Sequence, residues 1–202
     1  NEVSETKKFL EPGKLHGVEF PRWGNDAPVF SANPDIAKKH LNKKSLLGSG
    51  LRFSRALSLY AERRGAKLIH LEEEGAPAAV SAFLRTLLYE HEFPDDRTKE
   101  ADPIIVEASK VRGFDLKSFV TALQVWRSVL MLKKAEEEKC GTLIMGATHA
   151  RHLEQLGYDH EYHYSPLSKN VKNADLTGEI NAYLKYEKAF KQAVKRIQET
   201  KQ

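Results

Sequence analysis

A change of periodicity within residues 140–157 constrains the fold of this chain more than any other feature. The short apolar run Thr142–Met145 is bounded by a glycine on each side, which is typical of a buried parallel strand. Leu153 and Leu156 then follow at helical spacing, and Gly157 is the residue that favours a left-handed helix end. The sequence therefore predicts a strand, a tight turn and a short helix, which is the building unit of an α/β fold.

A second buried strand is predicted over Ala66–Leu71. It follows an amphipathic helix over residues 51–64 that ends at Gly65, and it runs directly into Glu72, Glu73 and Glu74. If the two strands are parallel neighbours, their carboxyl ends open onto one crevice, where α/β sheets bind ligands. The alternative is that these acids begin the next helix, where they favour the positive end of the helix dipole.

Polar side chains also follow the first strand. His149 and His152 are three residues apart and share one face of the predicted helix. The backbone N–H groups of a first helical turn disfavour a protonated imidazole, so either histidine is a candidate neutral base near pH 7. If the two strands are parallel neighbours, Glu72 or Glu73 would face His149 across the crevice.

Further helices are predicted by apolar spacing, over residues 77–93, 103–112 and 115–139 and from Asp175 or Thr177 onward. The alternating residues 161–164 predict a third strand. Arg127 lies close to the apolar stripe of the third of these helices. Its guanidinium either reaches the crevice and pairs with an anion or extends along the surface to water.

Residues 1–48 are rich in proline and poor in periodic apolar residues, which predicts an irregular N-terminal arm. Residues 49–202 are predicted to form a single α/β domain with a central, mainly parallel sheet flanked by helices. Within the arm, His16, Gly17 and Glu19 place two titratable groups beside a backbone that permits close approach. His16 and Glu19 are therefore candidate catalytic residues.

Composition excludes several classes of protein. The single cysteine, Cys140, excludes an intramolecular disulfide and a cysteine-based zinc cluster. The net charge is +4, and the Lys and Arg residues are spread among 28 acidic residues. This charge balance gives no specific nucleic-acid signal. No run approaches the roughly 20 apolar residues of a membrane span, and the first residues lack a signal-peptide core. We expect a soluble protein.

Three stretches resemble the erythromycin-esterase-like and ChaN-like superfamily, which has TraB and Tiki proteins as distant relatives. They are Gly146–Leu153 with its paired histidines, Leu15–Phe20 with its His-Gly pair, and the helical segment Arg127–Met131. The strand that ends in Glu72–Glu74 is similar in kind to the second acidic motif of the family. The resemblance implies an α/β fold with a cleft at the carboxyl ends of the strands. The superfamily includes ester hydrolases, haem-binding uptake proteins and secreted bacterial effectors, so fold alone does not settle function.

Our leading expectation is a hydrolase-like enzyme, with a small-molecule or host-protein substrate that the sequence does not define. His16 or His149 would be the general base, and His152 with Arg127 would stabilise negative charge. The effector members imply a cytoplasmic protein or one secreted into a host cell. No cofactor is expected on this reading. The alternatives are a haem- or divalent-metal-binding protein with ligands among Tyr162, His163 and Tyr164, and an interaction protein that has lost the chemistry, because Gly13 stands where the family places a glutamate.

Overall fold

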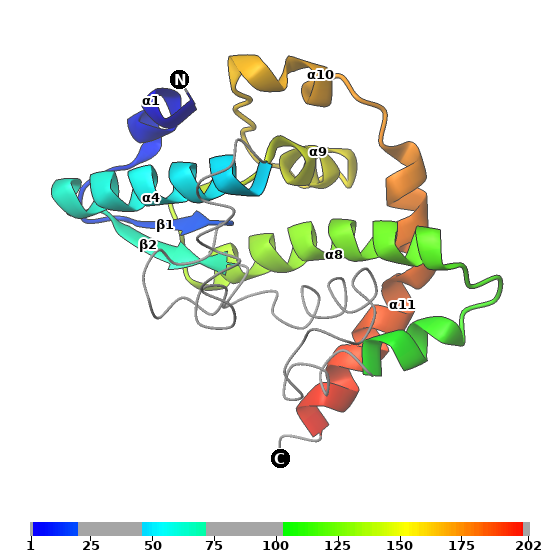
Figure 1. The fold of residues 1–202 in the computed structure, drawn as a ribbon. Coiled ribbons are helices and arrows are strands. Elements are labelled where there is room, and N and C mark those ends of the chain that lie inside the picture. Colours follow the sequence, from blue (N-terminus) through cyan, green and yellow to red (C-terminus); the bar gives the residue numbers. More distant parts are fainter. Residues whose placement is uncertain (1, 20–45, 72–102, 200–202) are drawn as a thin grey trace. The chain divides into compact units, whose positions relative to one another are not determined.

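The computed structural model describes residues 2–19, 46–71 and 103–199 of the chain (Figure 1). The predicted helix over 77–93 and the acidic cluster Glu72–Glu74 lie outside the described residues. The chain divides into two compact units, which differ from the division predicted at residue 48. Unit 1 comprises Asn1–Gly75 and Met131–Gly146, and unit 2 comprises Ala76–Leu130 and Ala147–Gln202.

Unit 1 contains a parallel three-stranded sheet. Its strands are β1 (Leu15–Val18), β2 (Lys67–His70) and β3 (Thr142–Ile144), in the order β2-β1-β3. The two strands predicted from the sequence are therefore present and parallel. The expectation that they are neighbours is wrong, because β1 lies between them. The expectation of an irregular arm is also wrong for residues 15–18, which form the central strand.

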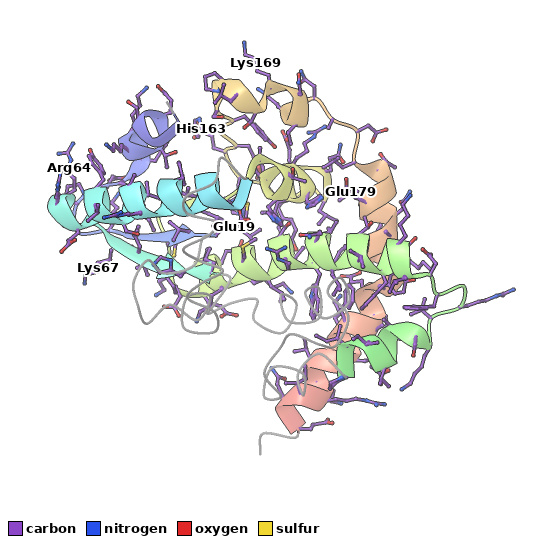
Figure 2. The ribbon with its side chains drawn as sticks, viewed as in Figure 1. Glu19, Arg64, Lys67, His163, Lys169 and Glu179 are labelled. Atoms are coloured by element: carbon purple, nitrogen blue, oxygen red, sulfur yellow. The ribbon has the colours of Figure 1, made fainter. Side chains whose placement is uncertain are left out.

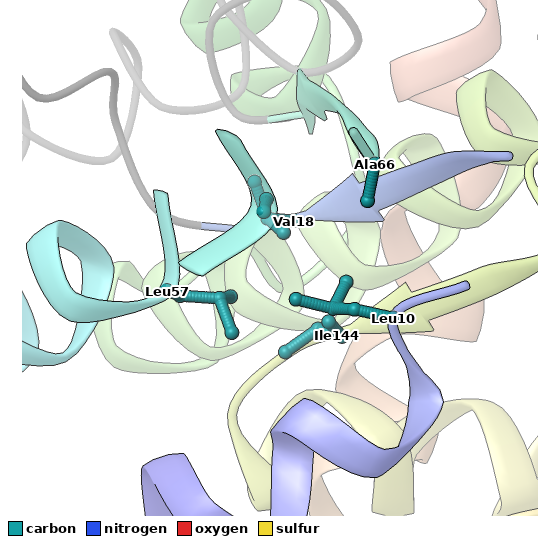
Figure 3. Close-up of a cluster of buried hydrophobic side chains, with 6 residues drawn as sticks. Leu10, Val18, Leu57, Ala66 and Ile144 are labelled. Carbon is teal, nitrogen blue, oxygen red and sulfur yellow. The ribbon is translucent and has the colours of Figure 1, made fainter. Parts of the chain in front are cut away.

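Helix α4 (Leu46–Arg64) covers one face of this sheet (Figure 1). It confirms the helix predicted over 51–64, although it begins earlier, and it ends before Gly65, whose φ is +68°. The buried cluster between helix and sheet is apolar; it consists of Leu10, Val18, Leu57, Ala61, Ala66 and Ile144 (Figure 3). The short helices α1 (Glu2–Thr6) and η1 (Lys7–Phe9) precede β1.

Unit 2 is helical in its described residues. A helix over residues 103–109 is followed by α8 (Leu116–Glu137, with the part up to Leu130 in this unit), α9 (Ala147–Gln155), η2 (Pro166–Ser168), α10 (Lys169–Lys172) and α11 (Thr177–Glu199). Aromatic side chains join α8 to α11. The rings of Trp126 and Phe190 stack with centroids 4.4 Å apart, and Phe119 meets Tyr186 edge-on at 5.7 Å. These contacts fix the two long helices against each other.

Several helix ends follow their sequence signals. An Asp115 carboxylate oxygen accepts a hydrogen bond from the Ser118 N–H at 2.8 Å, so Asp115 caps α8 as predicted. The Asp175 carboxylate accepts from the Thr177 N–H at 2.9 Å at the start of α11. Gly157 follows α9 with φ +82°, the left-handed conformation that its position predicted.

The third predicted strand, over residues 161–164, is wrong: the segment has no regular secondary structure. Its tyrosines bond to groups at the end of α9 and just after it. The Tyr162 hydroxyl donates to the Tyr158 carbonyl at 3.0 Å, and the Tyr164 hydroxyl donates to the Glu154 carboxylate at 2.9 Å. The alternation of polar and aromatic residues thus reflects packing of a loop on a helix. None of the described helices has the length and apolar character needed to cross a bilayer.

Candidate functional site

Four side chains of unit 2 form one hydrogen-bonded series across three helices. Ser128 Oγ on α8 lies 2.7 Å from His149 Nδ1 and 3.1 Å from His152 Nδ1, both on α9. His152 Nε2 lies 2.7 Å from the Glu179 carboxylate, in the first turn of α11. Figure 2 shows Glu179 at the start of α11. We call His149, Ser128, His152 and Glu179 the relay.

Local structure explains why these side chains meet. The spacing of three residues places His149 and His152 on one face of α9, with ring centroids 5.9 Å apart and an interplanar angle of 77°. Ser128 is short enough to sit within the buried side of α8, where its hydroxyl is also 3.2 Å from the Gln124 carbonyl of the preceding turn. The relay therefore requires all three helices to pack correctly.

Burial differs along the relay. Ser128 and His152 have no exposed surface, and His149 keeps 9% of its surface exposed. The Glu179 side chain is 36% exposed. A fully buried pair thus connects a partly exposed carboxylate at one end to a largely buried imidazole at the other.

His152 is neutral at pH 7. Burial lowers its pKa from the ordinary value of 6.5, and the nearby His149 ring lowers it further, while the hydrogen bond to Glu179 and its negative charge act in the opposite direction. Desolvation is the largest of these effects, since a buried imidazolium loses the hydration that stabilises its charge.

Because His152 is neutral, only one of its two ring nitrogens carries a proton, and this determines the donor and acceptor at each step of the relay. An ionised Glu179 only accepts hydrogen bonds, so His152 carries its proton on Nε2 and its lone pair on Nδ1. The Ser128 hydroxyl has one proton and two acceptors in reach, the Gln124 carbonyl at 3.2 Å and His152 Nδ1 at 3.1 Å. We assign the proton to His152 Nδ1, since otherwise two lone pairs would face each other there. His149 in turn donates from Nδ1 to Ser128 Oγ, so a singly protonated His149 ring has its lone pair on Nε2. This tautomer is assigned from the hydrogen-bond network.

No family model matches this chain, and no curated protein or solved structure matches it.

Two of the residues singled out in the sequence, His149 and His152, are brought together in the relay. Arg127 is the neighbour of Ser128 on α8 and is half-buried. One of its guanidinium nitrogens, Nη1, donates to the Gln124 side-chain oxygen at 2.6 Å. Arg127 is therefore held along its own helix by the preceding turn.

His16 and Glu19 belong to unit 1. His16 is fully buried on β1, and its Nε2 lies 3.1 Å from the backbone nitrogen and 3.2 Å from the carbonyl oxygen of Glu11. The Glu19 carboxylate accepts a hydrogen bond from the Gly146 N–H. Both side chains thus make contacts that hold the sheet and the turn after β3. Glu72 and Glu73 lie outside the described residues.

Binding of a metal ion or of haem would require a suitable set of ligand side chains. Within the described ranges, no group of three or more His, Cys, Asp or Glu side chains is arranged to hold a metal ion. Burial raises the pKa of Tyr162 to about 12. Burial, together with the hydrogen bond to Glu154, also raises the pKa of Tyr164. Both changes disfavour the phenolate form that a metal ligand needs.

Sequence reasoning missed Ser128 and Glu179. Ser128 is a small polar residue on the buried side of a long helix, followed by Val129 and Leu130, and a small polar residue at such a position is the available signal for a buried hydrogen bond. Glu179 is an acidic residue in the first turn of a helix. Acidic residues are favoured there by the helix dipole, so nothing in the sequence indicated a further role. Only the fold reveals that these residues share a partner.

Proposed function

We propose that this protein is a hydrolase-like enzyme in which His149 acts as a general base on water. The supporting observation is the relay, in which His149 Nδ1 is bonded to Ser128 Oγ and Nε2 is the ring nitrogen that carries the lone pair in the assigned tautomer. A neutral imidazole with this tautomer can accept a proton from a water molecule near pH 7. The attack of that water on an electrophilic carbonyl or phosphorus centre is the hydrolytic step.

The other members of the relay would support the charge that forms. When His149 takes a proton, its Nδ1–H bond to Ser128 strengthens, and the Ser128 hydroxyl in turn polarises His152. The Glu179 carboxylate at the far end compensates the positive charge on the histidines. This division of roles follows the logic of a triad, in which a carboxylate orients an imidazole and stabilises its charged form.

Ser128 is assigned a relay role and not that of a nucleophile. Its hydroxyl has no exposed surface and lies within a helix, between two imidazoles and a backbone carbonyl. A substrate carbonyl would have to enter the helix packing to reach it. Water is therefore the proposed nucleophile.

Acyl esters are the first substrate class to test, because the superfamily that the sequence resembles includes ester hydrolases. The experiment measures hydrolysis of p-nitrophenyl acyl esters and of p-nitrophenyl phosphate by the wild type and by His149→Ala. We expect the wild type to hydrolyse an acyl ester and His149→Ala to lose about a hundred- to ten-thousand-fold in kcat/KM.

The matched control is His160→Ala, which removes an exposed histidine of the same unit. It should keep wild-type activity, and circular dichroism should show that both variants fold. Equal activity of His149→Ala and the wild type would remove His149 from the mechanism. A wild type that hydrolyses none of these esters would overturn the hydrolase proposal.

A further inference from the structure

We propose that Arg151 and Gln155 are positioning residues that hold Glu179 on His152 by fixing residues 174–176. These three residues lead directly into α11, and we call them the strap. The proposal deepens the proposed function, on which its catalytic meaning rests, by naming residues outside the relay that set its geometry.

The side-chain amide of Gln155 makes hydrogen bonds to the strap through both its nitrogen and its oxygen. Its Nε2 donates to the Ala174 carbonyl at 3.2 Å, and its Oε1 accepts from the Leu176 N–H at 3.0 Å. One amide thus satisfies backbone groups two residues apart, as a neighbouring strand would. The strap therefore both accepts a hydrogen bond from α9 and donates one to it.

Arg151 makes a third bond to the same segment. Its Nε donates to the Ala174 carbonyl at 3.1 Å, while its Nη1 pairs with a Glu154 carboxylate oxygen at 2.7 Å. That oxygen also accepts from the Tyr164 hydroxyl at 2.9 Å. The Glu154 carboxylate and the strap carbonyl together hold the planar guanidinium in one orientation.

The strap is connected to Glu179 through the first turn of α11. The Leu176 carbonyl accepts from the Ile180 N–H at 3.0 Å, and this turn encloses Glu179. The Glu179 side chain is itself 36% exposed, so packing around it is incomplete. Its approach to His152 therefore depends on where the backbone of the turn is held.

His152 and the two residues that bind the strap belong to the same helix, α9. Arg151, His152 and Gln155 are consecutive or one turn apart on α9, so a shift of the strap relative to α9 is a shift of Glu179 relative to His152. Loss of Gln155 should therefore weaken the bond between His152 Nε2 and Glu179, although Gln155 touches neither atom.

The test records the imidazole nitrogen shifts of His152 by long-range proton–nitrogen NMR across pH, with no substrate present. Glu179→Ala provides the reference, because it removes the partner that favours Nε2–H and raises the pKa of His152. We expect Gln155→Ala to shift the His152 nitrogens and its pKa in the same direction as Glu179→Ala. The control Gln192→Ala, an exposed glutamine on α11, should leave them at wild-type values.

Gln155→Met is the second variant, since it keeps the length of the side chain, adds no charge and removes both hydrogen bonds to residues 174–176. It should shift His152 in the same direction as Gln155→Ala. Adding Gln155→Ala to Glu179→Ala should cause no further shift. Folded Gln155 variants with the wild-type His152 spectrum would overturn the positioning role. This readout needs no activity, so an inactive wild type would count against the proposed function alone.

Discussion

His152 and Glu179 are 27 residues apart in the chain and meet at 2.7 Å, with His152 donating from Nε2 to the carboxylate. This one bond determines which His152 nitrogen faces Ser128, and through Ser128 it determines the tautomer of His149. The bond is thus the origin of the proton order along the relay.

The free energy of unfolding should fall as the pH is lowered through about 6.5. The pKa of His152 is lower in the folded protein than its ordinary value of 6.5, so the unfolded chain binds the proton first and gains stability on acidification. The loss is at most about 1.4 kcal/mol per pH unit between the two pKa values. Urea denaturation across this range measures it.

His152→Gln removes this titrating group, so the free energy of unfolding should depend less on pH near 6.5. Carboxylates such as Glu154, whose pKa is lowered by Arg151, titrate below 4.5 and act at lower pH. A His152→Gln variant with the wild-type pH dependence would show that His152 does not carry the effect.

Removing the Ser128 hydroxyl should destabilise the fold. Ser128→Ala leaves Nδ1 of both buried histidines without their shared partner, which should cost about 1–3 kcal/mol. Ser109→Ala is the matched control, because Ser109 is an exposed serine of residues 103–109 whose hydroxyl also bonds to a backbone carbonyl. Its effect should stay within about 0.5 kcal/mol. Equal effects of the two substitutions in urea denaturation would argue against a buried network at Ser128.

Replacing two glycines with alanine should change the stability of the protein in opposite directions. A Cβ at Gly17, on the central strand, would lie 2.7 Å from Cδ1 of the fully buried Leu71, so Gly17→Ala should cost about 1–3 kcal/mol. Gly178 in α11 has no atom within 4 Å of such a Cβ, and Gly178→Ala should stabilise by about 0.5–1 kcal/mol. Thermal unfolding of both variants checks the pair. A harmless Gly17→Ala would show that the sheet has room at this position.

Local elements of the fold were readable from the sequence. The turn between β3 and α9 was predicted because glycines bound the apolar run and the periodicity changes after it. The start of α8 was predicted because Asp115 is a strong capping residue. Strand β1 was missed because Leu15–Val18 is only four residues long and lies in a proline-rich segment. Its central place depends on pairing with strands far away in the chain, which local patterns do not encode.

The site was predictable only in part for the same reason. His149 and His152 share a face by spacing alone, so their proximity follows from the helix. Their partners come from α8 and α11 and are selected by tertiary packing. The strand predicted at 161–164 failed because alternation of tyrosines fits both a sheet face and a loop packed on a helix, and Tyr162 and Tyr164 do the latter.

The most direct test of the central claim is the tautomeric state of both histidines in the wild-type protein at neutral pH, read from imidazole nitrogen shifts. We expect His152 to carry its proton on Nε2 and His149 to carry its proton on Nδ1, with the His149 lone pair on Nε2. A His149 ring protonated on Nε2 would contradict the relay and with it the assignment of His149 as the base.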